Sequence, residues 1–355
     1  MLYVLFALCL CPLPSDFAFC LLPFALCLLI FAFYLLTWRI LRPMLTIRQT
    51  SMLITLQDAG RTGLRHWGMP ASGALDWLAH GLASRLVGNT TDRASLEITA
   101  AGACLHFSQV TIISLVGADL GAELNDQPIS LGRAWLVRPN SELRFTQRRV
   151  GARCYLAIAG GFNLAPQLGS QSTLLGAPWH GYLARPLHIG DQLTYTEPNL
   201  SLAGRSLDTA SSISSQAPIR YLPNRQLANK LQRQFQAQTW QISSKSNRMG
   251  YRCEGPALAA PTQAVRSFGV VPGTIQLPPD GQPIVLLSDA QTTGGYPVLG
   301  VVIRADLPKL AQRLPLEYLQ FQPIGVTLAE RAFAEQLNIL RANFELEPLI
   351  LGTPI

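Results

Sequence analysis

Most of the chain consists of short apolar runs separated by turns that are rich in glycine and proline. Four of these runs are 110–116, 154–159, 284–287 and 301–303. Apolar runs this short, bounded by turn residues, are typical of buried β-strands, whereas helices need longer periodic segments. The sequence therefore predicts a mainly β protein with a few helices.

Three segments have the apolar spacing of helices, namely 74–86, 224–236 and 328–340. Two of them follow the start of a strand-rich region, so the two halves of the chain share a layout. This matching layout favours a duplicated β-barrel unit, although periodicity alone does not prove one.

The segment 199–216 is rich in Ser and Ala and lacks a periodic apolar face, which is typical of a linker. We therefore expect a first domain at 44–198, a second domain at 217–345 and a tail at 346–355.

The first 43 residues differ from the rest of the chain. Residues 17–38 are 22 positions without a charge, enough by length for a membrane-spanning helix. Three seven-residue blocks in this stretch begin with Phe-Ala and repeat at a strict period, as a tandem DNA repeat translated by accident would. We expect residues 1–43 to be an over-long gene prediction, with Met44 as the native start of a cytoplasmic protein. The alternative is a hydrophobic anchor flanked by Arg39 and Arg42.

Cysteine, histidine and charge patterns exclude several classes of protein. Cys104, Cys154 and Cys253 are scattered among apolar neighbours, so we expect reduced core thiols rather than disulfides or a metal cluster. The histidines lack metal-ligand spacing, and no metal site is proposed. The net charge of +7 comes mostly from scattered arginines without a basic run, so a nucleic-acid partner is not expected.

The segment 269–297 surrounds one buried strand with glycine and proline turns. The polar residues that follow this strand are Asp289, Gln291, Thr292 and Thr293, just before Gly294 and Gly295. Side chains at a strand end before a glycine turn lie at a rim, with backbone N–H groups free to face a ligand. The sequence therefore predicts that the functional site lies in this segment.

Glycine-rich turns with polar residues also precede the helix at 74–86. Ser72 or Gly73 can lie at the helix start, where free N–H groups bind anions, and Asp76 would then lie in the first turn. A simple helix cap explains Asp76 equally well. His66 is the best general-base candidate by residue type, because an imidazole titrates near neutrality, although a histidine beside Trp67 is often structural.

Nine motifs, taken in order, give the chain a family resemblance. They are LQDAGR, GMPASGALD, RLVGN, LEITAAG, YLAIAGGF, LGSQST, SNRMGYRCEGP, VVPGTIQLPPDGQP and DAQTTGGYP. This set resembles the biotin-dependent carboxyltransferase family that includes allophanate hydrolase subunit 2, KipA and the 5-oxoprolinase C subunit. The resemblance covers about 46–321, supports Met44 as the start, and implies two cyclophilin-like β-barrel domains.

The resemblance implies a subunit of an ATP-dependent 5-oxoprolinase, which opens the cyclic amide 5-oxoproline to glutamate and is not active alone. The implied partner is a protein of the allophanate hydrolase subunit 1 or KipI type, and a LamB/YcsF-type protein is a candidate third subunit. A membrane partner is not expected.

Cofactors would be shared with that partner. Biotin attaches to a lysine next to a methionine, and none of Met44, Met52, Met69 or Met249 adjoins a lysine, so this chain carries no biotin. The sequence also lacks a Gly-Lys-Ser/Thr phosphate loop, so ATP, with Mg²⁺ as a candidate ion, would be held with the partner.

Carried over onto this chain, the resemblance implies catalytic roles for Asp58, Arg61 and Asp289, to which His66 is added by residue type. The candidate substrate- or nucleotide-binding residues are Asn247, Arg248, Gln276, Gln291, Thr292, Thr293, Gly294, Gly295 and Tyr296. Arg248 or Arg61 would bind a carboxylate or phosphate through two hydrogen bonds. Asp289 would act as an acid, a base or a ligand of Mg²⁺. For Asp58, Asn247 and Gln276 the alternative is turn formation through their own side chains.

The chain departs from the family pattern at three places. Phe268 stands where relatives often have an acidic residue, Ala184 replaces a glycine, and Leu316-Glu317 stands where glycine is common after Pro315. The first change weakens a claim of identical chemistry. Two alternatives stay open: the carboxyltransferase half of a urea- or allophanate-type system with biotin on another chain, and a non-catalytic KipA-like regulator of a kinase inhibitor.

Overall fold

The computed structural model describes residues 42–207, 217–261 and 265–342. From Met44 onward the chain forms one compact unit. Most of the predicted N-terminal extension, part of the predicted linker and the predicted tail lie outside the described residues. Within those ranges no helix is both long enough and apolar enough to cross a membrane.

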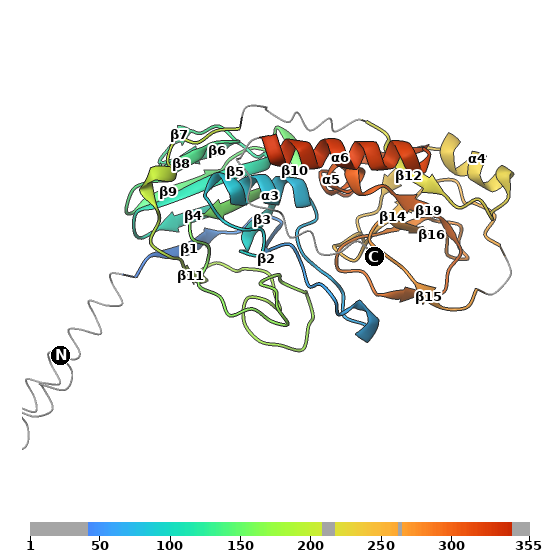
Figure 1. The fold of residues 1–355 in the computed structure, drawn as a ribbon, viewed down its shortest axis with the longest axis horizontal. Helices are drawn as coiled ribbons and strands as arrows, with labels where there is room; N and C mark the ends of the chain where they lie inside the picture. Colours follow the sequence, from blue (N-terminus) through green and yellow to red (C-terminus); the bar gives the residue numbers. More distant parts are fainter. Residues whose placement is uncertain (1–41, 208–216, 262–264, 343–355) are drawn as a thin grey trace, which may run out of the picture. The chain divides into compact units, whose positions relative to one another are not determined.

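The first half of this unit contains two antiparallel sheets. One has the strand order β11-β1-β4-β9-β6-β7 and the other β2-β3-β10-β5-β8 (Figure 1). Their strands are β1 (Met44–Gln49), β2 (Leu53–Gln57), β3 (Ser95–Thr99), β4 (Cys104–Phe107), β5 (Thr111–Asp119), β6 (Ala122–Leu124), β7 (Gln127–Pro128), β8 (Ala134–Val137), β9 (Ser141–Phe145), β10 (Val150–Ile158) and β11 (Gln192–Thr194). The apolar side chains of both sheets form one buried core that includes Leu45, Leu105 and Leu156.

The second half is built on an eight-stranded sheet with the order β20-β13-β14-β17-β16-β19-β12-β21. Its strands, together with the separate pair β15 and β18, are β12 (Ile219–Pro223), β13 (Trp240–Ile242), β14 (Gly250–Glu254), β15 (Phe268–Gly269), β16 (Thr274–Gln276), β17 (Ile284–Leu286), β18 (Thr293–Gly294), β19 (Val298–Val302), β20 (Tyr318–Leu319) and β21 (Phe321–Pro323). Only Gln320 separates the two edge strands β20 and β21 in the chain, so the edges meet and the sheet nearly closes into a barrel. Aromatic rings fill its interior, where Phe235 stacks on Phe321 with ring centroids 4.7 Å apart.

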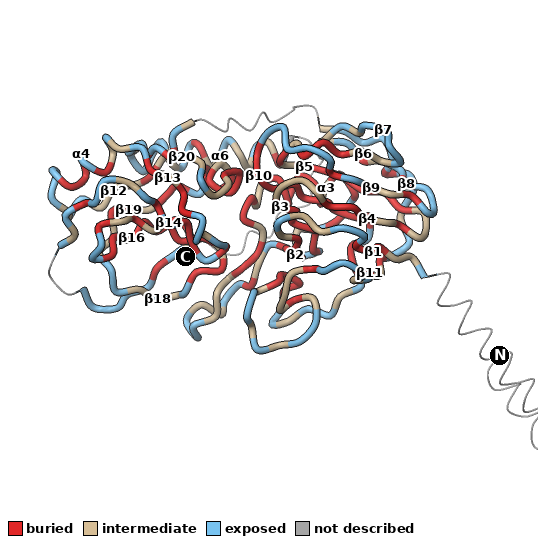
Figure 2. Tube along the Cα trace, turned by 180° about the vertical axis from the view of Figure 1, so that it is seen from behind, coloured by how far each residue is buried: buried red, intermediate tan, exposed pale blue. Residues whose placement is uncertain are grey.

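Helices cover parts of both halves. The described helices are α3 (Trp77–Leu86), α4 (Asn229–Ala237), α5 (Leu307–Ala311) and α6 (Val326–Ala342), with 3₁₀ turns η1 (Arg65–Trp67), η2 (Leu200–Leu202) and η3 (Arg304–Asp306). α6 belongs to both halves, because Leu340 is buried with the α3 residues and Ala332 with Ile303 of the second half. Figure 2 shows buried residues following β10, β3 and β14 through the interior.

The predicted mainly β fold is confirmed, and the four predicted strands correspond to β5, β10, β17 and β19. The three predicted helices are also present, although two begin later than expected. α3 begins at Trp77 because the carboxylate of Asp76 caps it, accepting a hydrogen bond from the Ala79 N–H at 2.9 Å. α4 begins only at Asn229 because the Asn224 side chain ties the preceding turn, donating to the Val298 carbonyl at 3.0 Å. The predicted division into two domains stays a prediction.

Candidate functional site

The two halves meet where the turn before α3 contacts the turn after β17. The Ser72 N–H donates to the Ser288 carbonyl at 2.9 Å, and the Ser72 hydroxyl lies 2.8 Å from Asp289 Oδ1. Ser72 has a φ of 56°, which only a fixed turn imposes on a residue with a side chain. This turn therefore brings a hydroxyl and a carboxylate together from segments that lie 217 residues apart in sequence.

Arg248 is the centre of the charged groups at this junction. Its Nε and Nη2 donate to the two carboxylate oxygens of Asp289 at 2.9 and 3.1 Å, and its Nη2 also donates to the Gly73 carbonyl at 2.6 Å. A second carboxylate, Glu97 on β3, accepts from Arg248 Nη1. Burial works to lower the pKa of Arg248, but the charges of Asp289 and Glu97 outweigh it and hold that pKa above its usual range.

Glu97 joins this pair to the core of the first half. Its Oε2 accepts hydrogen bonds from the Tyr155 hydroxyl at 2.7 Å and from the Leu75 N–H at 3.0 Å, and Arg153 Nε lies 3.9 Å from its Oε1. Burial would raise the pKa of Glu97, yet Arg248 and Arg153 hold it below its ordinary value. Glu97 was not among the predicted site residues. The signal that could have found it is a single carboxylate inside the otherwise uncharged strand 95–99.

Asp76 sits beside this network without a cation of its own. Its Oδ2 accepts from Gln312 Nε2 at 2.7 Å, and Gln312 Oε1 in turn accepts from the Ala152 N–H at 2.8 Å. Burial raises the pKa of Asp76 to about 6, against opposing hydrogen bonds from Gln312 and Ala79. The second of the two readings of Asp76, a helix cap, matches its placement.

Asp58 and Arg61 organise a loop of the first half. The Asp58 carboxylate accepts from the Gly60 N–H at 2.7 Å, the Ser170 hydroxyl at 2.8 Å and the Gln171 N–H at 2.6 Å. Arg61 Nη2 donates to the Ser172 carbonyl at 2.6 Å, and its guanidinium lies over the Trp179 ring at 4.8 Å. Burial lowers the pKa of Arg61, opposed by Asp58 and Asp289.

Arg61 Nη1 is buried without a hydrogen-bond partner among the described residues. Asp58 and Arg61 therefore lie near the junction but contact the loop 167–173 rather than each other.

Apart from Gln276, the remaining predicted residues of the second half lie at or near the surface. Asn247 is exposed and its Oδ1 accepts from the Met249 N–H at 2.9 Å, which is a turn made by its own side chain. Gln291, Thr293, Gly295 and Tyr296 are exposed, whereas Thr292 and Gly294 are half-buried. His66 is exposed in η1, and its ring packs edge-on against Trp67 with centroids 5.6 Å apart.

Gln276 lies against the β15–β18 pair. It is 2% exposed, and within the described part of the chain its Nε2 has no hydrogen-bond partner. Arg65 of η1 reaches the same place, because its Nη2 donates to the Val270 carbonyl. The structure therefore brings Gln276, Gly294 and Val270 together. This group is separate from the residues that pair with Arg248.

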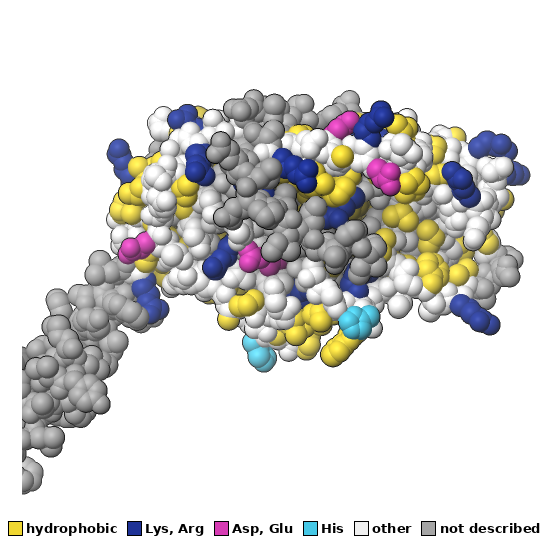
Figure 3. All heavy atoms as spheres, viewed as in Figure 1, with side chains coloured by type: hydrophobic (Ala, Val, Ile, Leu, Met, Phe, Trp, Pro, Cys, Tyr) yellow, Lys and Arg dark blue, Asp and Glu magenta, His cyan; other side chains and the backbone are white. Residues whose placement is uncertain are grey.

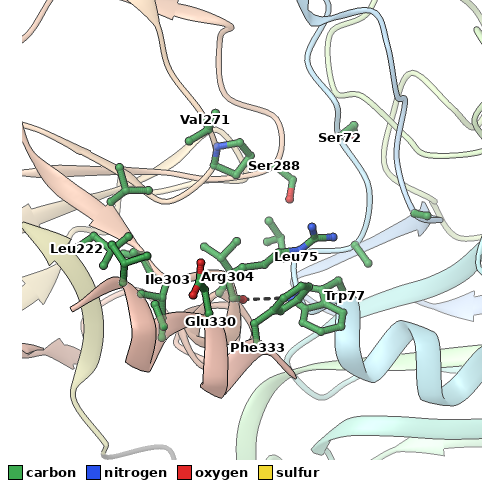
Figure 4. A pocket seen from close by; sticks show the side chains of 18 residues that line it. Ser72, Leu75, Trp77, Leu222, Val271, Ser288, Ile303, Arg304, Glu330 and Phe333 are labelled. Carbon is green, nitrogen blue, oxygen red and sulfur yellow. Dashed lines mark hydrogen bonds between the residues drawn. The ribbon is translucent and has the colours of Figure 1, made fainter. Parts of the chain in front are cut away.

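A cavity of about 550 Å³ opens at the junction. It is lined by Ser72, Leu75 and Trp77 of the first half, by Ser288 and residues around Arg304 of the second, and by α6 residues including Phe333 (Figure 4). A volume of this size suits a small organic ligand, and most of its lining is apolar. Ser288 directly precedes Asp289, so the ion-paired network lies behind one wall of the cavity.

Charged groups elsewhere are dispersed. On the face drawn in Figure 3 the Lys and Arg side chains lie apart from one another rather than in a stripe. Among residues 42–207, 217–261 and 265–342, no three His, Cys, Asp or Glu side chains come close enough together to hold a metal ion. Cys104, Cys154 and Cys253 are buried free thiols, and burial raises the pKa of Cys253 to about 12.

Comparison with known proteins assigns the chain to a family. A family model described as "Carboxyltransferase domain, subdomain A and B" matches residues 67–323, a range that begins after Asp58, Arg61 and His66. The 5-oxoprolinase C subunit of Escherichia coli (strain K12) is 38% identical over 280 residues, covering 77% of this chain and 88% of that protein. The Haemophilus influenzae protein of the same name is 35% identical over 300 residues, covering 83% and 95%.

More distant relatives are longer proteins. The urea amidolyase of Lachancea kluyveri is 30% identical over 307 residues, covering 78% of this chain and 17% of that protein. Among solved structures, TTHA0988 has a TM-score of 0.71 at 31% identity, covering 79% of this chain, which spans 56% of the length of that one. The K. lactis urea amidolyase has a TM-score of 0.77 at 27% identity, covering 86% of this chain and 20% of that one. From these matches, the chain belongs to the family of carboxyltransferase domains with subdomains A and B.

Proposed function

We propose that this chain is a subunit of an ATP-dependent 5-oxoprolinase, which hydrolyses the cyclic amide 5-oxoproline to glutamate together with partner subunits. The observation that carries the proposal is the 38% identity with the E. coli 5-oxoprolinase C subunit over 88% of that protein. The cavity at the junction adds support, because about 550 Å³ accommodates an amino-acid-sized ring.

The cavity does not fit a nucleoside triphosphate. Its charged lining residues are Arg304 and Glu330, with no lysine among the described ones. One guanidinium opposed by a carboxylate cannot balance a triphosphate. We therefore assign ATP, with Mg²⁺, to a surface shared with the partner. The roles of Gln291, Thr292, Thr293, Gly294, Gly295 and Tyr296 in nucleotide or substrate binding stay predictions.

We infer that the Arg248–Asp289 pair positions the cavity wall rather than reacting. Both oxygens of Asp289 accept hydrogen bonds from Arg248, and the Ser72 hydroxyl lies beside one of them. A carboxylate so engaged would have to leave its ion pair before it could take a proton or bind Mg²⁺. The catalytic roles of Asp58, Arg61 and His66 likewise stay predictions, with His66 the one that solvent reaches freely.

A partner of the allophanate hydrolase subunit 1 or KipI type would complete the site, with a LamB/YcsF-type protein as a third subunit and the cytoplasm as the compartment. Several large apolar side chains are exposed to solvent. Trp67 is 80% exposed, Val271 49% and Tyr296 44%. Exposed apolar groups of this size are typical of interaction surfaces when they cluster.

A second candidate function is the carboxyltransferase half of a urea-type system. It is favoured by the description of the matching family and by the 30% identity with a urea amidolyase. It requires biotin on another chain, which avidin would detect on a co-purified partner.

The deciding experiment reconstitutes the chain with its partner subunits. We expect release of ADP and glutamate that depends on 5-oxoproline and on every subunit. ATP turnover that ignores 5-oxoproline would contradict the proposal. Turnover stimulated by urea and bicarbonate, with biotin on a partner, would establish the second candidate instead.

A further inference from the structure

Arg304 is the positively charged residue among the described residues that line the junction cavity. It begins η3, and its guanidinium carbon lies 4.8 Å from the centroid of the Phe333 ring and 5.8 Å from that of Trp77. The Trp77 indole Nε1 also donates to the Arg304 carbonyl at 3.3 Å. Figure 4 shows the Arg304 side chain beside the rings of Trp77 and Phe333. Two aromatic rings from different elements therefore fix the direction of one charged group.

This guanidinium has no carboxylate partner in the described part of the chain. Glu330 lines the same cavity but forms no ion pair with it, and Asp306 at the end of η3 is instead paired with Arg220 and Lys309. Arg304 is exposed to solvent, and contact with the apolar wall desolvates its guanidinium only in part, which lowers its pKa. A cation that is partly desolvated and stacked, yet unpaired, gains from an anion that enters the cavity.

The size and charge of the cavity narrow the class of that anion. One guanidinium balances one carboxylate, and Glu330 disfavours a second negative group nearby. The remaining lining, with Leu75, Val302 and Leu307, offers apolar contact to the body of a ligand. The half-buried Ser288 hydroxyl of the lining can serve a ligand amide, whereas the Ser72 hydroxyl is already engaged by the Thr173 carbonyl and Asp289.

We propose that this cavity binds a small monocarboxylate, with the carboxylate on Arg304 between Trp77 and Phe333 and the body of the ligand against the apolar wall. Under the proposed function, on which this naming of the ligand rests, the monocarboxylate is 5-oxoproline. Arg304 is then a specificity-determining residue that selects a ligand bearing a carboxylate.

The test compares a carboxylate with its uncharged counterpart. Calorimetric titration of the full chain with 5-oxoproline and with 5-oxoprolinamide should show about tenfold tighter binding of the carboxylate, the usual effect of a charge-assisted hydrogen bond. Arg304→Gln should abolish this preference while leaving 5-oxoprolinamide binding unchanged. Phe333→Leu, which removes one of the two rings beside the guanidinium but keeps the charge, should reduce the preference by a smaller factor.

Arg133→Gln is the matched control, because Arg133 also lies over a tryptophan, at 5.0 Å from the Trp135 ring, but outside the cavity. It should keep the full preference. If Arg304→Gln folds as the wild-type protein does and still prefers the carboxylate, the proposal is wrong, whatever the enzyme does.

Failure of the proposed function gives a different result. If the reconstituted complex does not turn over 5-oxoproline, while proline or benzoate binds the chain and loses affinity in Arg304→Gln, the cavity proposal stands and the substrate is wrong. If none of these monocarboxylates binds the wild-type chain, the cavity proposal itself is overturned.

Discussion

The guanidinium of Arg248 donates to both carboxylate oxygens of Asp289, at 2.9 and 3.1 Å, with the two residues only 3% and 4% exposed. The same guanidinium also pairs with a second buried carboxylate, Glu97 of the first half. One cation therefore balances a carboxylate from each half. The halves are joined by charge as well as by apolar packing, since Arg153 Nη1 also donates to the Tyr251 hydroxyl at 2.9 Å.

Removing one charged partner of this network should lower the stability of the protein. In Asp289→Asn the buried Arg248 loses an opposing charge, and we expect a loss of about 3 kcal/mol in the free energy of unfolding. Urea denaturation at pH 7 measures it. Glu254→Gln, at an exposed position of β14, serves as the control and should change stability by less than about 0.5 kcal/mol. Equal losses in the two variants would show that the ion pair contributes nothing special.

Asp76 predicts a pH dependence of stability. Burial raises its folded pKa to about 6 from an ordinary value of 3.8. A carboxyl group whose pKa is raised on folding contributes stability that is fully present below its ordinary pKa and is lost as pH rises through the folded pKa of about 6. Between pH 5 and 7 the contribution of Asp76 to the free energy of unfolding should therefore fall by about 1.4 kcal/mol. Most of this loss occurs between pH 5 and the folded pKa, where the slope approaches about 1.4 kcal/mol per pH unit.

Urea denaturation of the wild-type protein and of Asp76→Asn across this pH range isolates the effect. The stability of the wild-type protein relative to Asp76→Asn should fall as pH rises. Asp280→Asn, an exposed loop position, should give a difference that does not vary with pH. A relative stability that instead rises with pH would mean that Asp76 is ionised and stabilising in the folded protein.

Strand and helix positions could be predicted because they depend on local patterns. The apolar run 110–116 lies largely within β5, where burial on both faces leaves no alternation to read. The helix start at Trp77 required knowledge that Asp76 caps α3, and the sequence admitted that as one of two readings.

The junction could not be predicted, because it depends on pairs far apart in sequence. Arg248 and Glu97 are 151 residues apart, and Ser72 and Asp289 are 217 apart. Their contact follows from how the two halves pack, which no local pattern records. Arg304 was missed for the same reason, because its aromatic neighbours lie on α3 and α6.

A side chain at Gly294 would force the end of the buried Gln276 side chain to move. A Cβ there would overlap Nε2 of the buried Gln276, whereas at Gly269, on the paired strand, nothing lies within 4 Å. Gly294→Ala should cost about 1–3 kcal/mol of stability, as overpacking does, and Gly269→Ala should be nearly neutral. Thermal unfolding tests this. Gln276→Ala should restore most of the loss in the double variant, and no rescue would refute the steric explanation.

Leu316 occupies a position where its backbone favours glycine. Its φ is 72° and its side chain is 61% exposed, so its backbone lies in the left-handed region that glycine adopts without strain. Leu316→Gly should raise stability by about 1 kcal/mol, because the left-handed strain disappears and little burial is lost. Leu175→Gly, at an exposed turn without positive φ, should instead lower stability. If both substitutions destabilise the protein alike, backbone strain at Leu316 is not significant.

The exposed polar residues after β17 offer a direct test of function. Gln291 and Thr293 are exposed, so Gln291→Ala and Thr293→Ala should leave the unfolding free energy within about 0.5 kcal/mol of the wild-type value. If these side chains meet substrate or nucleotide at a surface shared with the partner, kcat/KM of the reconstituted complex should fall about tenfold, the cost of one hydrogen bond to a charged group. Ser244→Ala, exposed in the turn after β13, is the control and should retain activity. Full activity in both variants would remove the segment 291–293 from the site and leave the cavity at Arg304 as the place where substrate binds.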